Sequence, residues 1–190
     1  MKQILAPSIL SADFKKLGEQ LELCEKSGAE YLHFDVMDGM FVQNISFGIP
    51  VLECIKGHTG MVLDVHLMIQ EPIRYAESFA KAGADILTIH YEACTDVQAT
   101  IDKIHSCGIK AGLTIKPGTP VEVLKPFLDQ VEMFLIMSAE PGQGGQGFER
   151  NAERQRTYDG HRGGWRYQDR QCCGSGKGRG EYHGGRLSCI

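Results

Sequence analysis

The stretch SGAEYLHFD, residues 27–35, decides the fold class, and its pattern returns as AGADILTIH at 82–90 and as CGIKAGLTI at 107–115. The glycine in the second position of each stretch is suited to end a helix in the left-handed conformation. The apolar, β-prone run that follows predicts a buried strand. A helix end followed by a buried strand, repeated along the chain, is typical of a parallel sheet with helical crossovers. The sequence therefore predicts an α/β fold, either a doubly wound sheet or a closed barrel.

Similar apolar runs predict six strands in all. They cover Ile4–Ile9, Tyr31–Val36, Met61–Leu67, Ile86–His90, Ala111–Ile115 and Met133–Met137. Asp13 can cap a helix between the first two strands, and the inward face of that helix would carry Leu17, Leu21 and Cys24. Further helix starts are marked by prolines, because a first helical turn tolerates a residue without an N–H. These are Pro50, Pro72 and Pro120.

The chain consists of two unlike parts that meet near Glu149. Residues 1–149 hold 11 Lys+Arg against 20 Asp+Glu, a net charge of −9, whereas residues 150–190 hold 9 against 4, a net charge of +5. The only aliphatic residues after Arg150 are Ala152, Leu187 and Ile190, so this tail has no material for a core. We therefore expect a barrel portion with strands one to six at 1–149, and a non-native or disordered basic tail, rich in Gly and Arg, at 150–190.

The composition argues against several classes of partner. The net charge of −4 gives no reason to expect nucleic acid or an anionic membrane, and no apolar run approaches the ~20 residues of a membrane span. The first residues lack the long apolar stretch of a signal peptide. Seven cysteines without regular spacing indicate reduced thiols rather than a disulfide framework. We expect a cytoplasmic protein.

Polar residues fall at the ends of the predicted strands. His33 and Asp35 alternate along the second strand, so both point to one side of the sheet, and His66 closes the third. In a parallel barrel the carboxyl ends of all strands meet at one face, where such enzymes do their chemistry. Two imidazoles and a carboxylate suit a divalent transition metal such as Zn²⁺ or Fe²⁺. Other polar residues lie near strand ends, namely Ser8, His90 and Lys116.

A glycine-rich segment, SAEPGQGGQGF, follows the sixth predicted strand at 138–148. Glycines let backbone N–H groups approach an anion closely, as in phosphate loops. On the same face as the metal candidates, this segment predicts a small phosphorylated substrate.

Four motifs together resemble those of the ribulose-phosphate 3-epimerases in order and spacing. They are LAPSILSADF at 5–14, LHFDVMDGMFVQNISFG at 32–48, DVHLMI at 64–69 and EPGQGGQGF at 140–148. The resemblance covers residues 1–148 and implies a (β/α)₈ TIM barrel of the ribulose-phosphate-binding type. Gln143 departs from the family pattern, where we expect an aromatic residue, and this should weaken apolar closure over the substrate.

The resemblance also implies roles for particular residues. His33, Asp35 and His66 would hold one divalent ion (Fe²⁺, Zn²⁺, Mn²⁺ or Co²⁺), and Asp35 would be one of two acid/base residues. Ser8, His66, Gly142, Gln143, Gly144 and Gly145 would contact the substrate and its phosphate, with Met37, Met68 and Met137 lining the site; ordinary core packing explains Met137 equally well. Asp38, beside Gly39, is interpreted as a turn residue.

The implied enzyme is an isomerase of the pentose phosphate pathway, and its relatives are often homo-oligomers. It would interconvert D-ribulose 5-phosphate and D-xylulose 5-phosphate. Metal polarisation of the ketone acidifies the C3 proton; one aspartate removes it, and a second returns a proton to the other face of the enediolate. Phosphate binding would anchor C3 between the two.

Two further family motifs, VDGG and GS, are missing from the tail. If Gly163–Ile190 is given permitted codons and read one nucleotide later, it can encode VDGGIKTDNVAAVARAGANIMVAGSAVF, which contains both. We therefore interpret the tail as a frameshift product, with the shift near 146–151. Six strands cannot close an eight-stranded barrel, so recognisable strands seven and eight are lacking. We expect this chain to be impaired or inactive and to aggregate.

Three alternatives stay open at the level of sequence. An allulose-6-phosphate 3-epimerase shares these motifs. A non-catalytic remnant could bind metal or sugar phosphate without exchanging the C3 proton. A basic-tailed nucleic-acid binder could use Trp165, Tyr167 and Tyr182 as stacking residues, and its binding would depend on salt.

Overall fold

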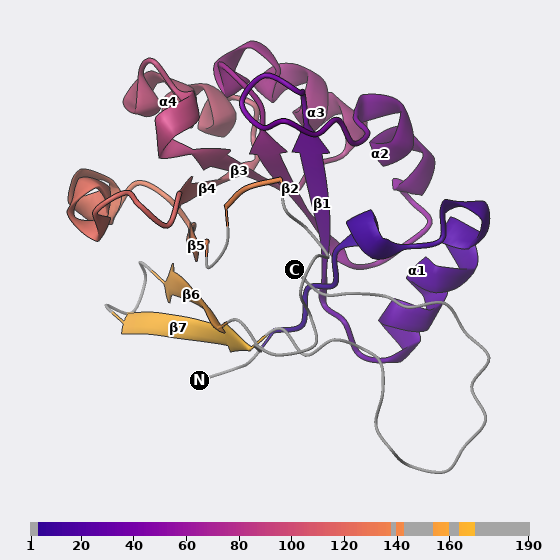
Figure 1. Ribbon diagram of the computed structural model, residues 1–190. Coiled ribbons are helices and arrows are strands. Elements are labelled where there is room, and N and C mark those ends of the chain that lie inside the picture. The colour runs from indigo at the N-terminus through magenta and orange to yellow at the C-terminus, as the bar shows by residue number, and fades with distance from the viewer. Residues whose placement is uncertain (1–3, 138–139, 143–153, 160–163, 170–190) are drawn as a thin grey trace.

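A five-stranded parallel sheet forms the centre of the computed structural model, which describes residues 4–137, 140–142, 154–159 and 164–169. Its strand order is β1-β2-β3-β4-β5, so each strand pairs with the next one along the chain (Figure 1). The strands are β1 (Tyr31–Met37), β2 (Val62–Met68), β3 (Ile86–His90), β4 (Lys110–Ile115) and β5 (Met133–Ile136). Four α-helices alternate with them, namely α1 (Leu17–Lys26), α2 (Ile49–Ile55), α3 (Ala76–Ala82) and α4 (Val97–Ser106).

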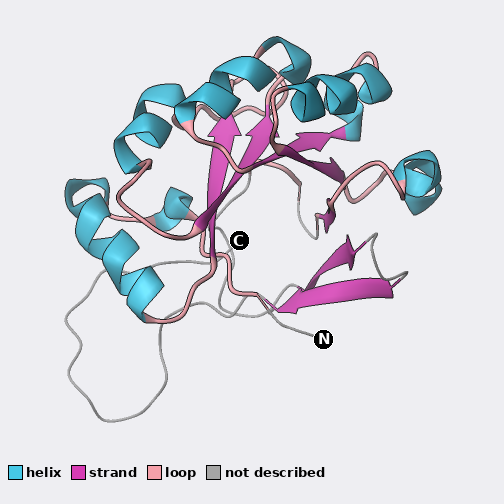
Figure 2. Ribbon diagram, turned by 180° about the vertical axis from the view of Figure 1, so that it is seen from behind, coloured by secondary structure: helices cyan, strands magenta, loops and turns pink. Residues whose placement is uncertain are grey.

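The order of the strands decides between the two predicted α/β architectures. A doubly wound sheet reverses its order at a switch point and carries helices on both faces. Here the order never reverses, and the α-helices lie on one side of a curved sheet (Figures 1 and 2). These are the features of a (β/α)₈ barrel wall, so the described sheet is a barrel portion with five consecutive parallel strands.

Alternation along the strands separates the core from the site. On β1, Leu32, Phe34 and Val36 are buried in the apolar cluster that the helices cover. His33 and Asp35 take the opposite side of the same strand. Glycines 28, 83 and 108 have φ of 87°, 112° and 78°, which confirms the left-handed helix ends predicted from the recurring stretches.

Short 3₁₀ turns complete the connections. They are η1 (Ile9–Ser11), η2 (Phe14–Lys16), η3 (Pro72–Arg74), η4 (Tyr91–Ala93) and η5 (Val121–Phe127). Asp13 caps η2, directly before α1, with its side chain accepting from the N–H of Lys15. Pro50 lies in the first turn of α2 as predicted, whereas Pro72 and Pro120 introduce 3₁₀ turns.

The predicted first strand, Ile4–Ile9, is wrong as a regular strand. The segment runs beside β1. The carbonyl of Leu5 accepts from the N–H groups of residues 30 and 31, and the carbonyl of Pro7 accepts from the N–H of His33. Only one residue of the segment, Ser8, forms a β-bridge, and its partner is His33. Pro7 has no N–H to donate to a ladder. The Ser8 hydroxyl then accepts from the N–H of Leu10 and starts η1 at Ile9, which ends the extended run.

A separate antiparallel pair lies in the basic tail. Strand β6 (Arg154–Asp159) pairs with β7 (Gly164–Asp169) and lies beside β5. Among the described residues this pair shares no ladder with the parallel sheet. The division at 149 and the frameshift origin of the tail stay predictions. Within the described ranges, no helix has the length and apolar character needed to cross a membrane.

Candidate metal centre

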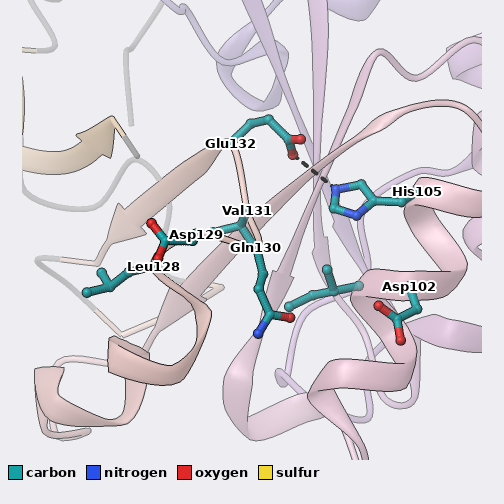
Figure 3. A pocket seen from close by; sticks show the side chains of 8 residues that line it. Asp102, His105, Leu128, Asp129, Gln130, Val131 and Glu132 are labelled. Atoms are coloured by element: carbon teal, nitrogen blue, oxygen red, sulfur yellow. Dashed lines mark hydrogen bonds and ion pairs between the residues drawn. The ribbon is translucent and has the colours of Figure 1, made fainter. Parts of the chain in front are cut away.

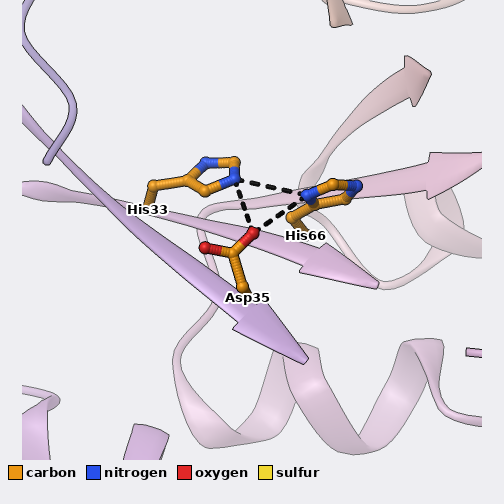
Figure 4. Close-up of side chains that lie close together, drawn as sticks. All are labelled: His33, Asp35 and His66. Carbon is orange, nitrogen blue, oxygen red and sulfur yellow. Dashed lines mark hydrogen bonds and ion pairs between the residues drawn. The ribbon is translucent and has the colours of Figure 1, made fainter. Parts of the chain in front are cut away.

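Three side chains from β1 and β2 bring their donor atoms together (Figure 4). Oδ1 of Asp35 lies 3.1 Å from Nε2 of His33 and 3.1 Å from Nδ1 of His66. The two imidazole nitrogens are 3.3 Å apart. The parallel register explains the convergence, because Asp35 pairs with His66 across the two strands while His33 is two residues before Asp35 on the same face. The structure thus unites the three residues for which the sequence predicts metal binding.

The triangle of donor atoms fits a divalent transition metal. Around a tetrahedral ion with bonds of about 2.0–2.1 Å, neighbouring donors lie about 3.3 Å apart. All three side chains are almost completely buried, and two nitrogens with one carboxylate oxygen form a donor set for ions such as Zn²⁺ or Fe²⁺. A search of the described residues for three or more His, Cys, Asp or Glu side chains whose donor atoms lie close together gives this group.

The charge state of these groups favours metal binding. Burial acts to raise the pKa of Asp35, but the charge and hydrogen bonds of His33 and His66 outweigh it and hold the pKa well below the ordinary value. Burial lowers the pKa of His66, against the influence of Asp35. The carboxylate is therefore ionised and His66 is neutral at pH 7, as ligands must be. Ser8, named from the sequence as a substrate contact, donates its hydroxyl to Oδ2 of Asp35 at 2.5 Å.

His33 is held from behind by a carboxylate that the sequence analysis did not single out. Nδ1 of His33 lies 2.8 Å from Oδ2 of Asp64, and Oδ1 of Asp64 accepts from the Thr88 hydroxyl at 2.8 Å. A carboxylate at the second nitrogen fixes the tautomer and the orientation of a metal-binding histidine. Burial acts to raise the pKa of Asp64, but His33 and Thr88 lower it, so this group is also ionised.

His66 is supported differently, by another histidine. Its Nε2 lies 2.9 Å from Nε2 of His90, and Nδ1 of His90 lies 3.5 Å from Oε2 of Glu92. Burial lowers the pKa of His90 to about 4. Burial acts to raise the pKa of Glu92, but the nearby His90 imidazole and hydrogen bonds from the Thr119 hydroxyl and the backbone of Lys116 lower it to about 2. The sequence pointed to His90 as a polar strand end but gave no reason to connect it with Glu92.

The predicted substrate contacts lie around the same end of the sheet. Met37 and Met68 are buried together with Val42 in a small apolar cluster, and Met137 is also buried. Gly142, with φ of 85°, packs on Val42, and its carbonyl accepts from the Asn44 amide. Their contact with a substrate stays a prediction. Gln143, Gly144 and Gly145 lie outside the described residues.

The loops after β1 and β2 are tied together at this end by Asp38. Its Oδ1 accepts from the N–H groups of Met40 and Phe41, and its Oδ2 from the N–H of Gln70. These backbone bonds match the interpretation of Asp38 as a turn residue. Beside this turn, a hollow of about 450 Å³ reaches from Met40 to Lys116, whose Nζ lies 4.1 Å from the centre of the Phe41 ring.

A second hollow, of about 480 Å³, lies at the amino ends of β4 and β5 (Figure 3). It is lined by Ile101, Asp102, His105, Leu128, Asp129, Gln130, Val131 and Glu132. Glu132 accepts from the N–H of Ala111 and pairs with Nε2 of His105 at 3.2 Å, so it links α4 to the amino end of β4. In a barrel this end serves stability rather than chemistry, which leaves the triad as the functional candidate.

Comparison with known proteins extends the similarity over most of the chain. The pattern of the Ribulose-phosphate 3 epimerase family matches residues 4–155. The ribulose-phosphate 3-epimerase of Bacillus subtilis is 51% identical over 144 residues, which cover 76% of this chain and 66% of that protein. The enzyme of that name from Synechocystis is 48% identical over 147 residues, covering 76% of this chain and 64% of that protein. The chloroplastic ribulose-5-phosphate-3-epimerase of Arabidopsis thaliana is 48% identical over 147 residues, which cover 76% of this chain and 52% of that protein. The chain spans less than two thirds of the length of these relatives.

Proposed function

Because the chain belongs to the ribulose-phosphate 3-epimerase family, we propose that its site is the metal-binding half of an isomerase that interconverts D-ribulose 5-phosphate and D-xylulose 5-phosphate. The observation that carries the proposal is the buried triad of His33, Asp35 and His66, whose donor atoms lie 3.1–3.3 Å apart. Fe²⁺, Zn²⁺, Mn²⁺ and Co²⁺ are the candidate ions, since all accept this mixture of nitrogen and oxygen donors.

Asp35 is the proposed acid/base residue. Its Oδ1 faces the two histidines, whereas its Oδ2 is available to take a proton once the Ser8 hydroxyl turns aside. A carboxylate with a lowered pKa is a weak base, so the C–H it attacks has to be acidified. A divalent ion held by His33, Asp35 and His66 would supply that acidity by stabilising negative charge on the substrate's carbonyl oxygen.

The remaining contacts are assigned by their place around the triad. Met37, Met68 and Met137 would give the reacting carbons apolar surroundings, and Ser8 and His66 would contact the sugar. Gly142 with Gln143, Gly144 and Gly145 would hold the phosphate through backbone N–H groups. The relatives described above are all named as pentose-phosphate epimerases, which supports a five-carbon substrate over allulose 6-phosphate.

A second candidate function is a remnant that binds metal and sugar phosphate but does not epimerise. It is favoured by the contrast between a complete triad and the missing VDGG motif, which would bring the second acid/base residue. Such a remnant would bind the sugar phosphate without exchanging the C3 proton. We also propose a cytoplasmic location, a homo-oligomeric state and no nucleic-acid partner.

The two candidates are separated by following the C3 proton. The full chain is loaded with Co²⁺ or Zn²⁺ and incubated with D-ribulose 5-phosphate in D₂O, and NMR records deuterium at C3 and the formation of D-xylulose 5-phosphate. Epimerisation that disappears in Asp35→Asn supports the full activity. Deuterium at C3 without epimerisation supports Asp35 as the base of an incomplete isomerase site and contradicts the remnant. Substrate binding without deuterium at C3 supports the remnant. If neither metal nor sugar phosphate binds, both candidates are wrong.

A further inference from the structure

The second nitrogen of His66 makes a contact that the proposed reaction does not use. Nε2 of His66 lies 2.9 Å from Nε2 of His90, with ring centroids 4.9 Å apart and ring planes inclined by only 24°. Two ring nitrogens at this separation, with one N–H between them, form a hydrogen bond. Both rings are buried, at 1% and 0% exposure, so neither nitrogen can turn to water instead.

The direction of this hydrogen bond follows from proton bookkeeping. A hydrogen bond between two imidazole nitrogens needs one N–H and one lone pair. Nδ1 of His66 points to Asp35 and His33, where a metal ligand must offer a lone pair. With a metal bound at Nδ1, the proton of neutral His66 is therefore on Nε2, and Nε2 of His90 has to accept it. The proton of neutral His90 is then on Nδ1.

Glu92 lies where that last proton points. Its Oε2 is 3.5 Å from Nδ1 of His90. Its other oxygen, Oε1, accepts from the N–H of Lys116 at 2.8 Å and from the Thr119 hydroxyl, so the carboxylate is anchored to the loop after β4. A small closing movement of His90 or Glu92 would complete a chain from the metal site through His66 and His90 to Glu92.

We propose that His90 and Glu92 are positioning residues that hold His66 in the one tautomer that can bind a metal through Nδ1. The inference rests on the proposed metal site. It gives the two histidine ligands different supports, the Asp64 carboxylate directly behind His33 and a His–Glu pair behind His66. Histidine supports of this kind affect metal affinity without touching the ion.

The test uses the metal-free full chain, titrated with Co²⁺ against a chromophoric chelator. His90→Phe keeps an aromatic ring but removes the acceptor, and should weaken Co²⁺ binding about 10–100-fold. His90→Gln can offer an amide oxygen to Nε2 of His66 and should restore binding to within about threefold of the parent. His105→Phe is the matched control, because it removes an analogous His–Glu pair, with Glu132, at the opposite end of the sheet (Figure 3). It should leave binding unchanged.

A second readout tests the tautomers directly. In zinc-loaded protein with ¹⁵N-labelled histidine, NMR should show the proton of His66 on Nε2 and that of His90 on Nδ1, and Glu92→Gln should weaken the second preference. This measurement does not need a folded His90→Phe variant. Equal Co²⁺ affinity in the parent and His90→Phe, or a proton on Nε2 of His90, would overturn the inference. If the parent itself binds no Co²⁺, the proposed metal site is wrong, whereas Co²⁺ binding that His90→Phe does not weaken overturns only the role of His90 and Glu92.

Discussion

Asp64→Asn tests whether the carboxylate behind His33 contributes to metal affinity through its charge. The two side chains are nearly isosteric. The amide oxygen of asparagine can accept from Nδ1 of His33, as Oδ2 of Asp64 does at 2.8 Å, and the amide NH₂ can donate to the Thr88 oxygen, which takes part in a 2.8 Å bond now. The hydrogen-bond geometry can therefore survive while the negative charge is lost.

The expected size of the effect follows from this geometry. Removing the outer partner of a metal-binding histidine costs about 10–100-fold in metal affinity. Because Asp64→Asn keeps the contact and loses only the charge, we expect the lower end, about tenfold or about 1.4 kcal/mol. Asp64→Leu removes both the charge and the carboxylate contact of the His33 imidazole and should lie at the upper end, about 100-fold.

The assay is competition for Zn²⁺ between the metal-free chain and a chromophoric chelator at pH 7, with circular dichroism to verify that each variant is folded. Asp102→Asn is the control, because Asp102 is an exposed carboxylate on α4 that bonds only to the Gln98 amide among its described hydrogen bonds. Zn²⁺ affinities within twofold of each other for the parent, Asp64→Asn and Asp64→Leu would refute the role assigned to Asp64.

Three further predictions concern stability, pH and thiol reactivity. Gly112→Ala places a methyl group against the Thr88 hydroxyl, so urea unfolding should show a loss of about 1–3 kcal/mol. Gly18→Ala, whose added methyl group meets nothing within 4 Å, should leave stability equal or higher. Equal effects at the two sites would contradict this expectation. Burial lowers the pKa of His90 from 6.5 to about 4, so between these values the unfolded chain binds more protons and stability should fall as the pH falls. With a chelator present, the free energy of unfolding should fall between pH 6.5 and pH 4 by about 3 kcal/mol less in His90→Gln than in the parent. Equal losses in the two proteins would be inconsistent with a buried neutral imidazole. Burial raises the pKa of Cys94 to about 11, so iodoacetamide at pH 8 should label exposed Cys54 much faster than Cys94 in native protein, as peptide mapping can establish; faster labelling of Cys94 would argue against its burial.

The parallel strands and the metal triad could be predicted because both depend on short-range patterns. The alternation of side chains along a strand predicts that His33 and Asp35 share one face of β1. The repeated glycine-to-strand pattern predicts that β2 is the neighbour of β1, and in the structure His66 of β2 pairs with Asp35. The supporting residues depend on register, which periodicity does not provide. Asp64 lies opposite His33 across the β1–β2 ladder. In the run VLDVHLM, Asp64 is two residues before His66 and shares its face of the strand, so the sequence could have indicated it as a candidate site residue.

Other features were beyond the reach of the sequence pattern. The first predicted strand contains Pro7, which has no N–H, and ends where Ser8 caps the 3₁₀ turn η1. The segment therefore forms only a single bridge to β1. Glu92 reaches His90 through the anchoring bonds from Lys116 and Thr119, which come from a loop more than 20 residues away. The proposed phosphate contacts at Gln143–Gly145 lie outside the described residues. Resequencing the DNA for residues 137–190 would decide whether the tail is frameshifted.

Zinc titration of the metal-free full chain, followed by X-ray absorption at the zinc edge, is the strongest test of the metal site. We expect one tightly bound ion per chain, bonded to two imidazole nitrogens and to oxygen donors, and loss of that ion in His33→Ala and in His66→Ala. A parent chain that binds no zinc, or one whose zinc and ligand set are unchanged in both variants, would contradict the assignment of His33, Asp35 and His66 as the metal site.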